Sequence, residues 1–598
     1  KNRIKQYLLA ASMCVGLTAC SDFFEPIPGV QFGLDETFAS KQRTEEYLNN
    51  VYSYVREVTD AIHPNTYGGI FTEASLDGAN RWNKTYAEWT NGSFNSASAQ
   101  ASEYFSKYYQ AIAKASTFIQ NVDKCTEAAA STRGKWKSEA RALRAYYYFE
   151  LLRLYGPIPL IGEDPIPLDA SLEELIKERN SVDECVNFIA TELQSAIDSG
   201  DLLQRAGKAN LGRMDVATCM ALKAKLYLYW ASPLFNGNTD QASVKNKDGK
   251  QLFPQTEDNS KWAQARDAYE RFMTFATGQG YKLTEVYTNG KLDPYASCRA
   301  AGEFFTTTWE AVDELIFVKL RDLYDYTYWV CPKFTDFQDT DVTGGGGYYT
   351  TQETVDLFFT KDGLTIEEDP GYDKFEGIPS ANNFTSGRYY DPNNPSRLYF
   401  DADKSKVLKQ WKDREPRFYV NITYSGSIWL NEGKYNEEMR TDFTNGANGT
   451  CGKSKASGDC PDSGYLIRRG AKASNNNGSK HFSPVLRLAD MYLGYAEALC
   501  MCSDLDNALT YLNKIRVRAG IPEYTFTATA GKITCPKTQT DLLNRIRRER
   551  LVELVFEWNR YFDVRRWKVA EGQNDPEHWI YPAYHTGGEG GKVYGMNM

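Results

Sequence analysis

Apolar residues recur with helical periodicity through the N-terminal third of the chain. In the segment 103–122 five large side chains fall near one stripe, at Phe105, Tyr109, Ile112, Phe118 and Ile119. This spacing predicts an amphipathic helix. A second helical pattern, 135–156, ends at Gly156-Pro157, which is a strong stop signal. Further helices are predicted at 182–198, 214–231 and 262–276.

The pattern changes between about residues 280 and 480. Short stretches with strand character, such as 314–320 ("ELIFVKL") and 417–424 ("RFYVNITY"), are separated by long loops rich in Gly, Asn and Asp. Helical patterns return after Ser483 and end in one long pattern over 541–567. The chain is therefore predicted to be mostly α. We expect a helical scaffold over about 41–276 and 484–570, with a loop-rich insert containing short strands over about 277–483.

The helical pair 486–519 resembles a tetratricopeptide unit. Ala496 and Ala508 stand twelve residues apart, like the small residues at which the two helices of such a unit touch. The expected large positions hold Tyr492, Tyr495, Leu499 and Leu512. The segment 262–272 resembles a second half-unit, but no strict 34-residue repeat continues. We therefore expect degenerate helical pairs that form a scaffold.

The N-terminus has the features of an export signal. Basic residues at Lys1, Arg3 and Lys5 precede an apolar run, 7–19, that is shorter than the ~20 residues of a membrane span. The run ends in "LTAC", which resembles a bacterial lipobox, so Cys20 is the predicted lipidation site. The alternative is an ordinary signal followed by a chance cysteine. We predict a signal peptide at 1–19 and a lipid anchor with its tether at 20–40, which holds a protein to a bilayer without a spanning helix.

Asp22 and Glu25 follow the predicted lipidation site directly. Acidic residues at this place resemble the signal by which some Gram-negative bacteria move lipoproteins to the cell surface. We therefore expect an outer-membrane protein, lipid-anchored and facing the cell exterior.

The overall charge argues against nucleic-acid binding. The chain carries 69 Lys and Arg against 78 Asp and Glu, a net charge of −9, whereas phosphate backbones require a clustered positive surface. The basic run 545–550 is interleaved with acids further on and is typical of a solvated or ion-paired helix. The 40 Tyr and 12 Trp are either core filling or suited to wet, sugar-binding surfaces.

No metal or cofactor site is predicted. CxxC and CxxH pairs are absent, which argues against zinc. The glycine-rich stretch 446–454 fails as a phosphate-binding loop because its glycine spacing is one residue too long and no apolar strand precedes it. Cys451 and Cys460 flank a polar loop, and whether they form a disulfide is left open.

One carboxylate pair deserves comparison with a hydrolase site. Glu553 and Glu557 stand at i and i+4, which could in principle place two acids together. However, Arg550, Arg560 and Asp563 follow the same helical pattern at i,i+3 spacing, so we interpret these acids as ion-paired within one helix. The protein is therefore predicted not to be an enzyme.

Two aromatic segments are the better functional candidates, because sugars stack on aromatic rings while polar groups hold their hydroxyls. The segment 77–89 contains polar and aromatic candidates at Asp77, Arg81, Trp82, Asn83, Tyr86 and Trp89. Core packing on a helix face explains the aromatic spacing equally well. The segment 321–330 places Tyr324, Tyr326 and Tyr328 on one alternating face with Trp329 opposite. Such exposed aromatic area is costly without a ligand or partner.

The chain resembles the SusD/RagB family of nutrient-binding outer-membrane lipoproteins. The resemblance extends over nearly the whole mature chain and is carried by the segments 143–161, 314–320, 354–363, 413–426, 486–500, 512–522 and 547–567. It implies a helical scaffold with tetratricopeptide-like pairs, displayed at the cell surface as a lid over a SusC-like TonB-dependent transporter. It also implies capture of an oligosaccharide or, in some members, a peptide, without catalysis.

The resemblance places ligand contacts in loops equivalent to 77–89 and 320–330. The candidate ligand-binding residues are thus Asp77, Arg81, Trp82, Asn83, Tyr324, Tyr326, Tyr328 and Trp329. One departure concerns packing: Trp558 stands where the family often has glycine. A peptide-binding subunit and a non-catalytic docking scaffold remain alternatives, and neither the glycan nor its linkage follows from the sequence.

Overall fold

The computed structural model describes most of the chain between residues 33 and 569. The described residues are 33–56, 70–75, 77–81, 95, 98–162, 170–302, 310–321, 324–334, 344–373, 379–430, 439–443, 451, 459–471 and 481–569. The predicted signal, Cys20, Trp82, Asn83 and nearly all of 446–454 lie outside them.

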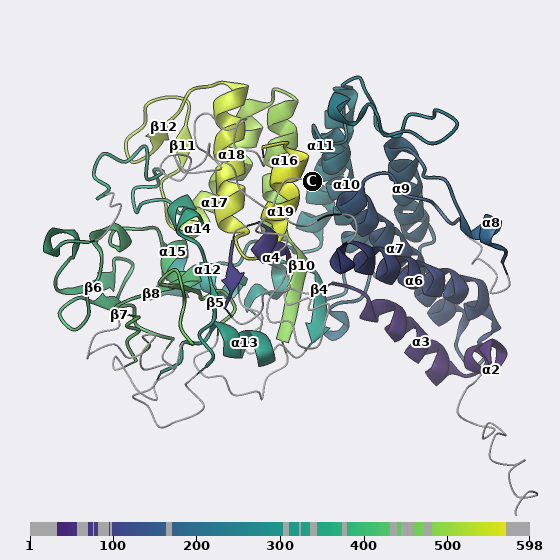
Figure 1. Ribbon diagram of the computed structural model, residues 1–598, viewed down its shortest axis with the longest axis horizontal. Coiled ribbons are helices and arrows are strands. Elements are labelled where there is room, and N and C mark those ends of the chain that lie inside the picture. Colours follow the sequence, from purple (N-terminus) through teal and green to yellow (C-terminus); the bar gives the residue numbers. More distant parts are fainter. Residues whose placement is uncertain are drawn as a thin grey trace, which may run out of the picture.

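Five long helices form one side of the molecule, each packed on the next in chain order (Figure 1). They are α6 (Ala99–Asn121), α7 (Ala130–Tyr155), α9 (Val182–Asp198), α10 (Val216–Ala231) and α11 (Ser260–Gly278). All five were predicted from the apolar periodicity. Their local start signals are also present: Ser181 caps α9 in a capping box with Glu184, and Asp215 accepts a hydrogen bond from Thr218 N at the start of α10.

Shorter helices and single 3₁₀ turns are distributed along the chain. The remaining N-terminal helices are α2 (Leu34–Ala39), α3 (Lys41–Ser53), α4 (Ile70–Ala74) and α8 (Leu172–Leu175). Single 3₁₀ turns are η1 (Val122–Lys124), η2 (Lys208–Asn210), η3 (Thr239–Gln241), η4 (Glu310–Asp313), η5 (Ala381–Asn383) and η6 (Lys409–Trp411).

The C-terminal helices complete the scaffold. α16 (Leu488–Met501) and α17 (Leu505–Ala519) form the predicted pair, and α16 packs on both α11 and α18 (Gln539–Glu553). Ala496 and Ala508 are fully buried, as the tetratricopeptide comparison requires. Gly494 allows close approach of α11, since a Cβ there would lie 2.2 Å from the Tyr269 hydroxyl oxygen.

The prediction of one long helix over 541–567 is wrong. α18 ends at Glu553, and α19 (Asn559–Arg566) begins only after a turn, residues 554–558. Phe556 and Trp558 in this turn have left-handed backbone conformations, with φ of 62° and 64°. The apolar periodicity continues across the break because both helices and the turn itself face the same core.

The middle region contains short helices and strands between long loops. Its helices are α12 (Pro294–Gly302), α13 (Tyr324–Val330), α14 (Gln352–Leu357) and α15 (Pro416–Asn421). A four-stranded sheet has the order β1 (Ala79–Asn80), β5 (Tyr348–Tyr349), β9 (Tyr465–Ile467) and β8 (Ile422–Tyr424), with every pair antiparallel.

The other strands form two-stranded ribbons. β4 (Leu315–Arg321) pairs antiparallel with β10 (His481–Arg487), and β6 (Arg388–Asp391) with β7 (Asn394–Asp401). Two further pairs are β2 (Tyr287–Thr288) with β3 (Lys291–Leu292), and β11 (Tyr524–Thr525) with β12 (Ile533–Thr534).

The strand-like segment 417–424 is only partly a strand. Pro416 occupies the first turn of α15, where its missing N–H costs nothing, and the strand β8 begins at Ile422. One apolar cluster extends from Phe38 to Val569 and joins scaffold and middle region. Within the described residues, no helix is long and apolar enough to span a membrane.

Candidate functional site

The two candidate ligand segments meet at strand β5, although about 230 residues separate them in sequence (Figure 1). On one side the Arg81 amide donates to Gly347 O at 2.9 Å, next to the β1–β5 pairing. On the other side the Gly345 amide donates to Tyr328 O at 2.8 Å. The glycine run 344–347 thus joins β1 to α13.

Glycine is required in this run by the close approach of α13. A Cβ at Gly344 would lie 2.5 Å from Tyr328 O and from Cys331, and Gly346 has a φ of +60°. The amides of Gly344 and Gly346 donate to Pro332 O and Cys331 O, so the run satisfies carbonyl groups at the end of the helix. The relative placement of β1 and α13 is therefore set by backbone contacts.

The expected alternating face in 321–330 is wrong, because these residues form the helix α13. Tyr326 and Trp329, at i and i+3, are 1% and 4% exposed and face the core, while Tyr328 is half-buried. The Tyr326 hydroxyl donates to Arg469 O at 2.8 Å, and its ring packs edge-on against Tyr348. Tyr324 is the first residue of α13. Ligand binding by these four residues stays a prediction.

Asp77 and Arg81 have different environments. Asp77 is 1% exposed, and its carboxylate accepts a hydrogen bond from Arg560 Nη1 at 3.2 Å. Burial raises the pKa of the Asp77 carboxyl to about 6, although Arg560 acts in the opposite direction. Arg81 keeps about 20% of its side chain exposed and forms an ion pair with the exposed Asp462. Arg81 is therefore the more accessible of the two to a ligand.

Two residues near Arg81 were missed by the sequence reasoning. Tyr349 on β5 is half-buried and pairs in register with Ala79, two residues before Arg81. Burial, Asp462 and Glu73 raise the pKa of its hydroxyl, whereas Arg81 lowers it. Asp462 reaches Arg81 from the turn before β9. The only sequence signal for Tyr349 was the "GGGGYYT" stretch, in which a tyrosine pair follows the glycine run.

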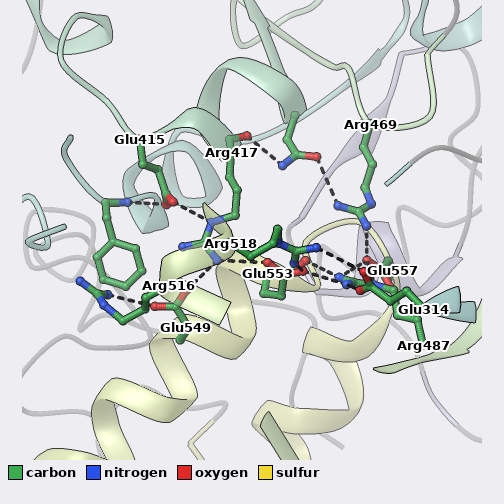
Figure 2. Close-up of polar contacts among 12 residues, drawn as sticks. Glu314, Glu415, Arg417, Arg469, Arg487, Arg516, Arg518, Glu549, Glu553 and Glu557 are labelled. Carbon is green, nitrogen blue, oxygen red and sulfur yellow. Dashed lines mark hydrogen bonds and ion pairs between the residues drawn. The ribbon is translucent and has the colours of Figure 1, made fainter. Parts of the chain in front are cut away.

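A buried network of arginines and glutamates, drawn in Figure 2, adjoins α13 through Arg469, whose backbone carbonyl accepts from the Tyr326 hydroxyl. Its labelled members are Glu314, Glu415, Arg417, Arg469, Arg487, Arg516, Arg518, Glu549, Glu553 and Glu557. Arg487 is the centre: its Nη1 lies 2.8 Å from both Glu314 Oε1 and Glu553 Oε1, and its Nε lies 3.0 Å from Glu557. Burial raises the pKa of the Glu553 carboxyl, but Arg518, Arg487 and Arg417 outweigh it and hold that pKa below its usual range.

The interpretation of Glu553 and Glu557 needs one correction. Both acids are ion-paired, but their partners come from distant elements: Arg417, Arg487 and Arg518 for Glu553, and Arg469 and Arg487 for Glu557. Arg550 and Arg560, the partners expected from helical spacing, bind Asp490 and Asp563, and Asp77 and Glu353, respectively. Helical spacing failed at Glu557 because α18 ends at Glu553, and it failed at Glu553 because the arginines that pair with this acid arrive from other elements.

Within the part of the chain that the structure describes, no group of three or more His, Cys, Asp or Glu side chains is arranged to hold a metal ion. Cys451 and Cys460 are both buried.

Two family models match the chain and together extend over most of it. Residues 314–590 match the SusD family, and residues 31–228 match a family described as starch-binding and associating with the outer membrane. The first match includes α13, β5 and the arginine network, and the second includes β1, the long helices α6, α7 and α9, and most of α10.

Individual relatives agree with these models. A SusD-like protein of Bacteroides ovatus is 27% identical over 175 residues, which is 28% of this chain and 30% of that protein. The chain thus aligns with less than a third of that relative's length. The solved structure of a protein named BT4246 is 25% identical with a TM-score of 0.68, covering 88% of this chain and 89% of its own.

A second solved structure, a SusD-like carbohydrate-binding protein of Bacteroides fragilis, has the same fold. It is 18% identical with a TM-score of 0.59, covering 90% of this chain and 88% of its own. The family models, the curated relative and the shared helical architecture lead to one conclusion: this chain belongs to the SusD/RagB family.

Proposed function

We propose that this protein is a surface-exposed outer-membrane lipoprotein that binds an oligosaccharide and delivers it to a partner TonB-dependent transporter of the SusC type. It acts by binding and not by catalysis. Membership of the SusD/RagB family supports glycan binding, and the N-terminal family model describes proteins that associate with the outer membrane.

The observation that carries the proposed site is the junction at β5. Two segments that contain sugar-binding residue types lie on either side of one glycine run. The Arg81 amide donates a backbone hydrogen bond to Gly347 O, and the Gly345 amide donates one to Tyr328 O. The Arg81 guanidinium, the half-buried Tyr349 and the carboxylate of Asp462 therefore lie together at this junction. Rings supply stacking surface and charged groups bind hydroxyls, which is the chemistry that a glycan needs.

Within this site we assign two kinds of role. Arg81, Tyr328 and Tyr349, which keep accessible surface, contact the ligand, together with Trp82 and Asn83, which follow Arg81 directly in sequence. Asp77, Tyr326 and Trp329 are buried and hold the two segments in place, and Tyr324 begins the helix that carries the second segment.

Binding to soluble glycans tests the proposal. Wild-type protein is run in affinity gels containing starch, laminarin or other polysaccharides, and titrated by calorimetry with the matching oligosaccharide. Replacing Arg81 or Tyr328 by alanine should weaken binding by about tenfold or more, since 1.4 kcal/mol corresponds to a factor of ten. The matched control is Tyr390→Ala, because Tyr390 on β6 is an exposed tyrosine away from β5.

The same preparations separate the competing functions. Retained affinity in both site variants would place the glycan site elsewhere. Binding of peptides but of no glycan would favour the peptide-binding alternative, and binding of neither would favour a docking scaffold. Turnover of any bound glycan would contradict a purely binding role.

Localisation is tested by the lipidation site. Cys20→Ala should release the protein from the membrane fraction and abolish incorporation of a labelled fatty acid, because acyl chains supply the anchoring energy. Label that persists in the variant would rule out Cys20 as the lipidated residue. Co-purification of a TonB-dependent transporter with the wild-type protein, from mildly solubilised membranes, tests the partner.

A further inference from the structure

The turn between α18 and α19 and the first turn of α19 contact residues that lead to both candidate ligand segments. The conformation of the turn between the helices is unusual, because Phe556 and Trp558 both have left-handed backbone dihedral angles, which are unfavourable for non-glycine residues. Such a turn persists only when its surroundings hold it. The side chains that hold it are those of the buried arginine network.

Glu557, at the centre of the turn, is connected to α13 by a short path. Its carboxylate forms an ion pair with Arg469, in which both side chains are about 95% buried (Figure 2). The backbone carbonyl of Arg469 accepts the hydrogen bond from the Tyr326 hydroxyl. Arg469 therefore links Glu557 in the turn to α13, the helix that carries the second ligand segment.

Arg487 gives Glu557 a second connection to α13. Its Nη2 lies 2.9 Å from Glu557 Oε1, and it also donates to Glu553 O at 2.7 Å. Arg487 ends β10, where it pairs in register with Leu315 of β4. Since β4 leads directly into α13, the position of this ribbon relative to the turn sets where α13 begins.

Arg560 connects the first turn of α19 to the other ligand segment. Its Nη1 lies 3.2 Å from the Asp77 carboxylate and its Nη2 lies 2.5 Å from Glu353. Asp77 in turn is held through its backbone, whose carbonyl accepts from Thr350 Oγ1 beside β5. The side chains of Arg560 and Asp77 are each 2% exposed.

We propose that Glu557 and Arg560 are positioning residues for the ligand site: one left-handed turn holds α13 through Arg469 and β1 through Asp77, and so sets the spacing of the two ligand segments. The expected effect of this role on ligand affinity rests on the proposed function. Its expected effect on the positions of the two ligand segments does not. It explains why groups three residues apart in sequence have partners in different parts of the fold.

Three variants separate this role from general stabilisation. Glu557→Gln removes the charge that holds Arg469, and Arg560→Lys keeps the charge but removes the fork that bridges Asp77 and Glu353. The matched control is Glu549→Gln. Glu549 is fully buried and paired with Arg417 and Arg516 at 2.6 and 3.0 Å. Within the described residues the polar partners of these arginines also include Glu415, Glu553, Pro522 O and Gly363 O, none of which belongs to β1 or α13.

Amide hydrogen exchange of the full-length protein without glycan is the first measurement. Glu557→Gln should speed exchange at least tenfold in 324–334 and in the glycine amides 344–346, leaving 77–81 near wild type. Arg560→Lys should instead speed exchange at least tenfold in 77–81 and leave 324–334 and 344–346 near wild type. Glu549→Gln should lower the melting temperature yet leave both segments within about twofold of wild type.

Affinity for maltoheptaose, a soluble starch fragment, is the second measurement. Glu557→Gln and Arg560→Lys should each weaken it at least threefold, and Glu549→Gln should leave it unchanged. If the wild type binds no maltoheptaose, starch is not the ligand, and the exchange pattern alone decides the positioning role. Exchange footprints that are the same in all three variants would overturn the proposal. If Glu557→Gln does not fold, Arg560→Lys decides: unchanged exchange in 77–81 would overturn it.

Discussion

The scaffold helices and the middle region are stabilised by different chemistry. Between α7, α9 and α10 apolar side chains fill the core, with Leu143, Ile189 and Leu222 each at most 2% exposed. The buried ion pair between Arg144 on α7 and Glu192 on α9 joins two side chains and involves no backbone carbonyl. In the middle region, buried guanidinium groups donate to backbone carbonyls in the last turn of the short helix α14 and directly after it. Arg414 Nη2 lies 2.8 Å from both Val355 O and Phe358 O, and Arg548 donates to Asp356 O and Leu357 O.

The difference follows from the backbone. A helix satisfies its own amides and carbonyls, so apolar side chains suffice to pack it. A short helix such as α14 leaves its last carbonyl groups without intrahelical partners, and a buried carbonyl needs a donor. Arginine supplies five donors on one side chain, and the glutamates of Figure 2 neutralise the charge that this brings inside.

The largest expected effect is from Arg487→Met. This change leaves Glu314, Glu553 and Glu557 without their shared cation, and breaking a buried ion network in this way costs about 3–5 kcal/mol. Thermal and chemical unfolding measure it. The comparison variant is Leu222→Ala in α10, expected to cost about 3 kcal/mol while leaving exchange in 324–334 unchanged. If Arg487→Met and Leu222→Ala gave the same pattern of amide hydrogen exchange, the scaffold helices and the middle region would not be stabilised separately.

A smaller effect is expected from the titration of Asp77. Its pKa is raised to about 6 in the folded protein and is about 3.9 when unfolded. Between these two pH values the folded state therefore binds a proton that the unfolded state does not. The contribution of the Asp77 carboxyl to the free energy of unfolding is complete below pH 4 and is lost as the pH rises to 6. The wild type should lose about 2–3 kcal/mol relative to Asp77→Asn over this range. Melting temperatures at pH 4, 5, 6 and 7 measure the difference, and parallel curves would contradict the raised pKa.

The smallest expected effect is at Trp558, where the family often has glycine. Trp558→Gly loses the packing of the ring against Phe71 and the Arg56 guanidinium, a cost of about 3–5 kcal/mol. The same change relieves the strain of the left-handed backbone, which is worth about 1–2 kcal/mol. A net loss of about 2 kcal/mol should result. Trp558→Ala should be about 1 kcal/mol less stable than Trp558→Gly, because alanine keeps the strain. The opposite order in unfolding measurements would show that the turn is not strained.

Local patterns determined the scaffold. The apolar stripes and start signals of α6, α7, α9, α10 and α11 are contained within each segment, and helices close their own hydrogen bonds, so neighbouring residues suffice to specify them. The small residues Ala496 and Ala508 likewise predicted the α16–α17 pair. Residue types alone also selected 77–89 and 321–330 as candidate ligand segments, and family resemblance joined them into one site.

Only the tertiary structure decided what depends on distant partners. Tyr326 and Trp329 belong to a helix and face inward because the 344–347 backbone and Arg469 hold α13 there, and Tyr349 joins the site only through strand pairing. The break after Glu553 is stabilised by Arg469 and Arg487, which are 88 and 70 residues from Glu557 in sequence. Spacing along one helix cannot specify an ion pair whose partner arrives from another element, because the energy of that pair exists only once the fold has excluded water around it.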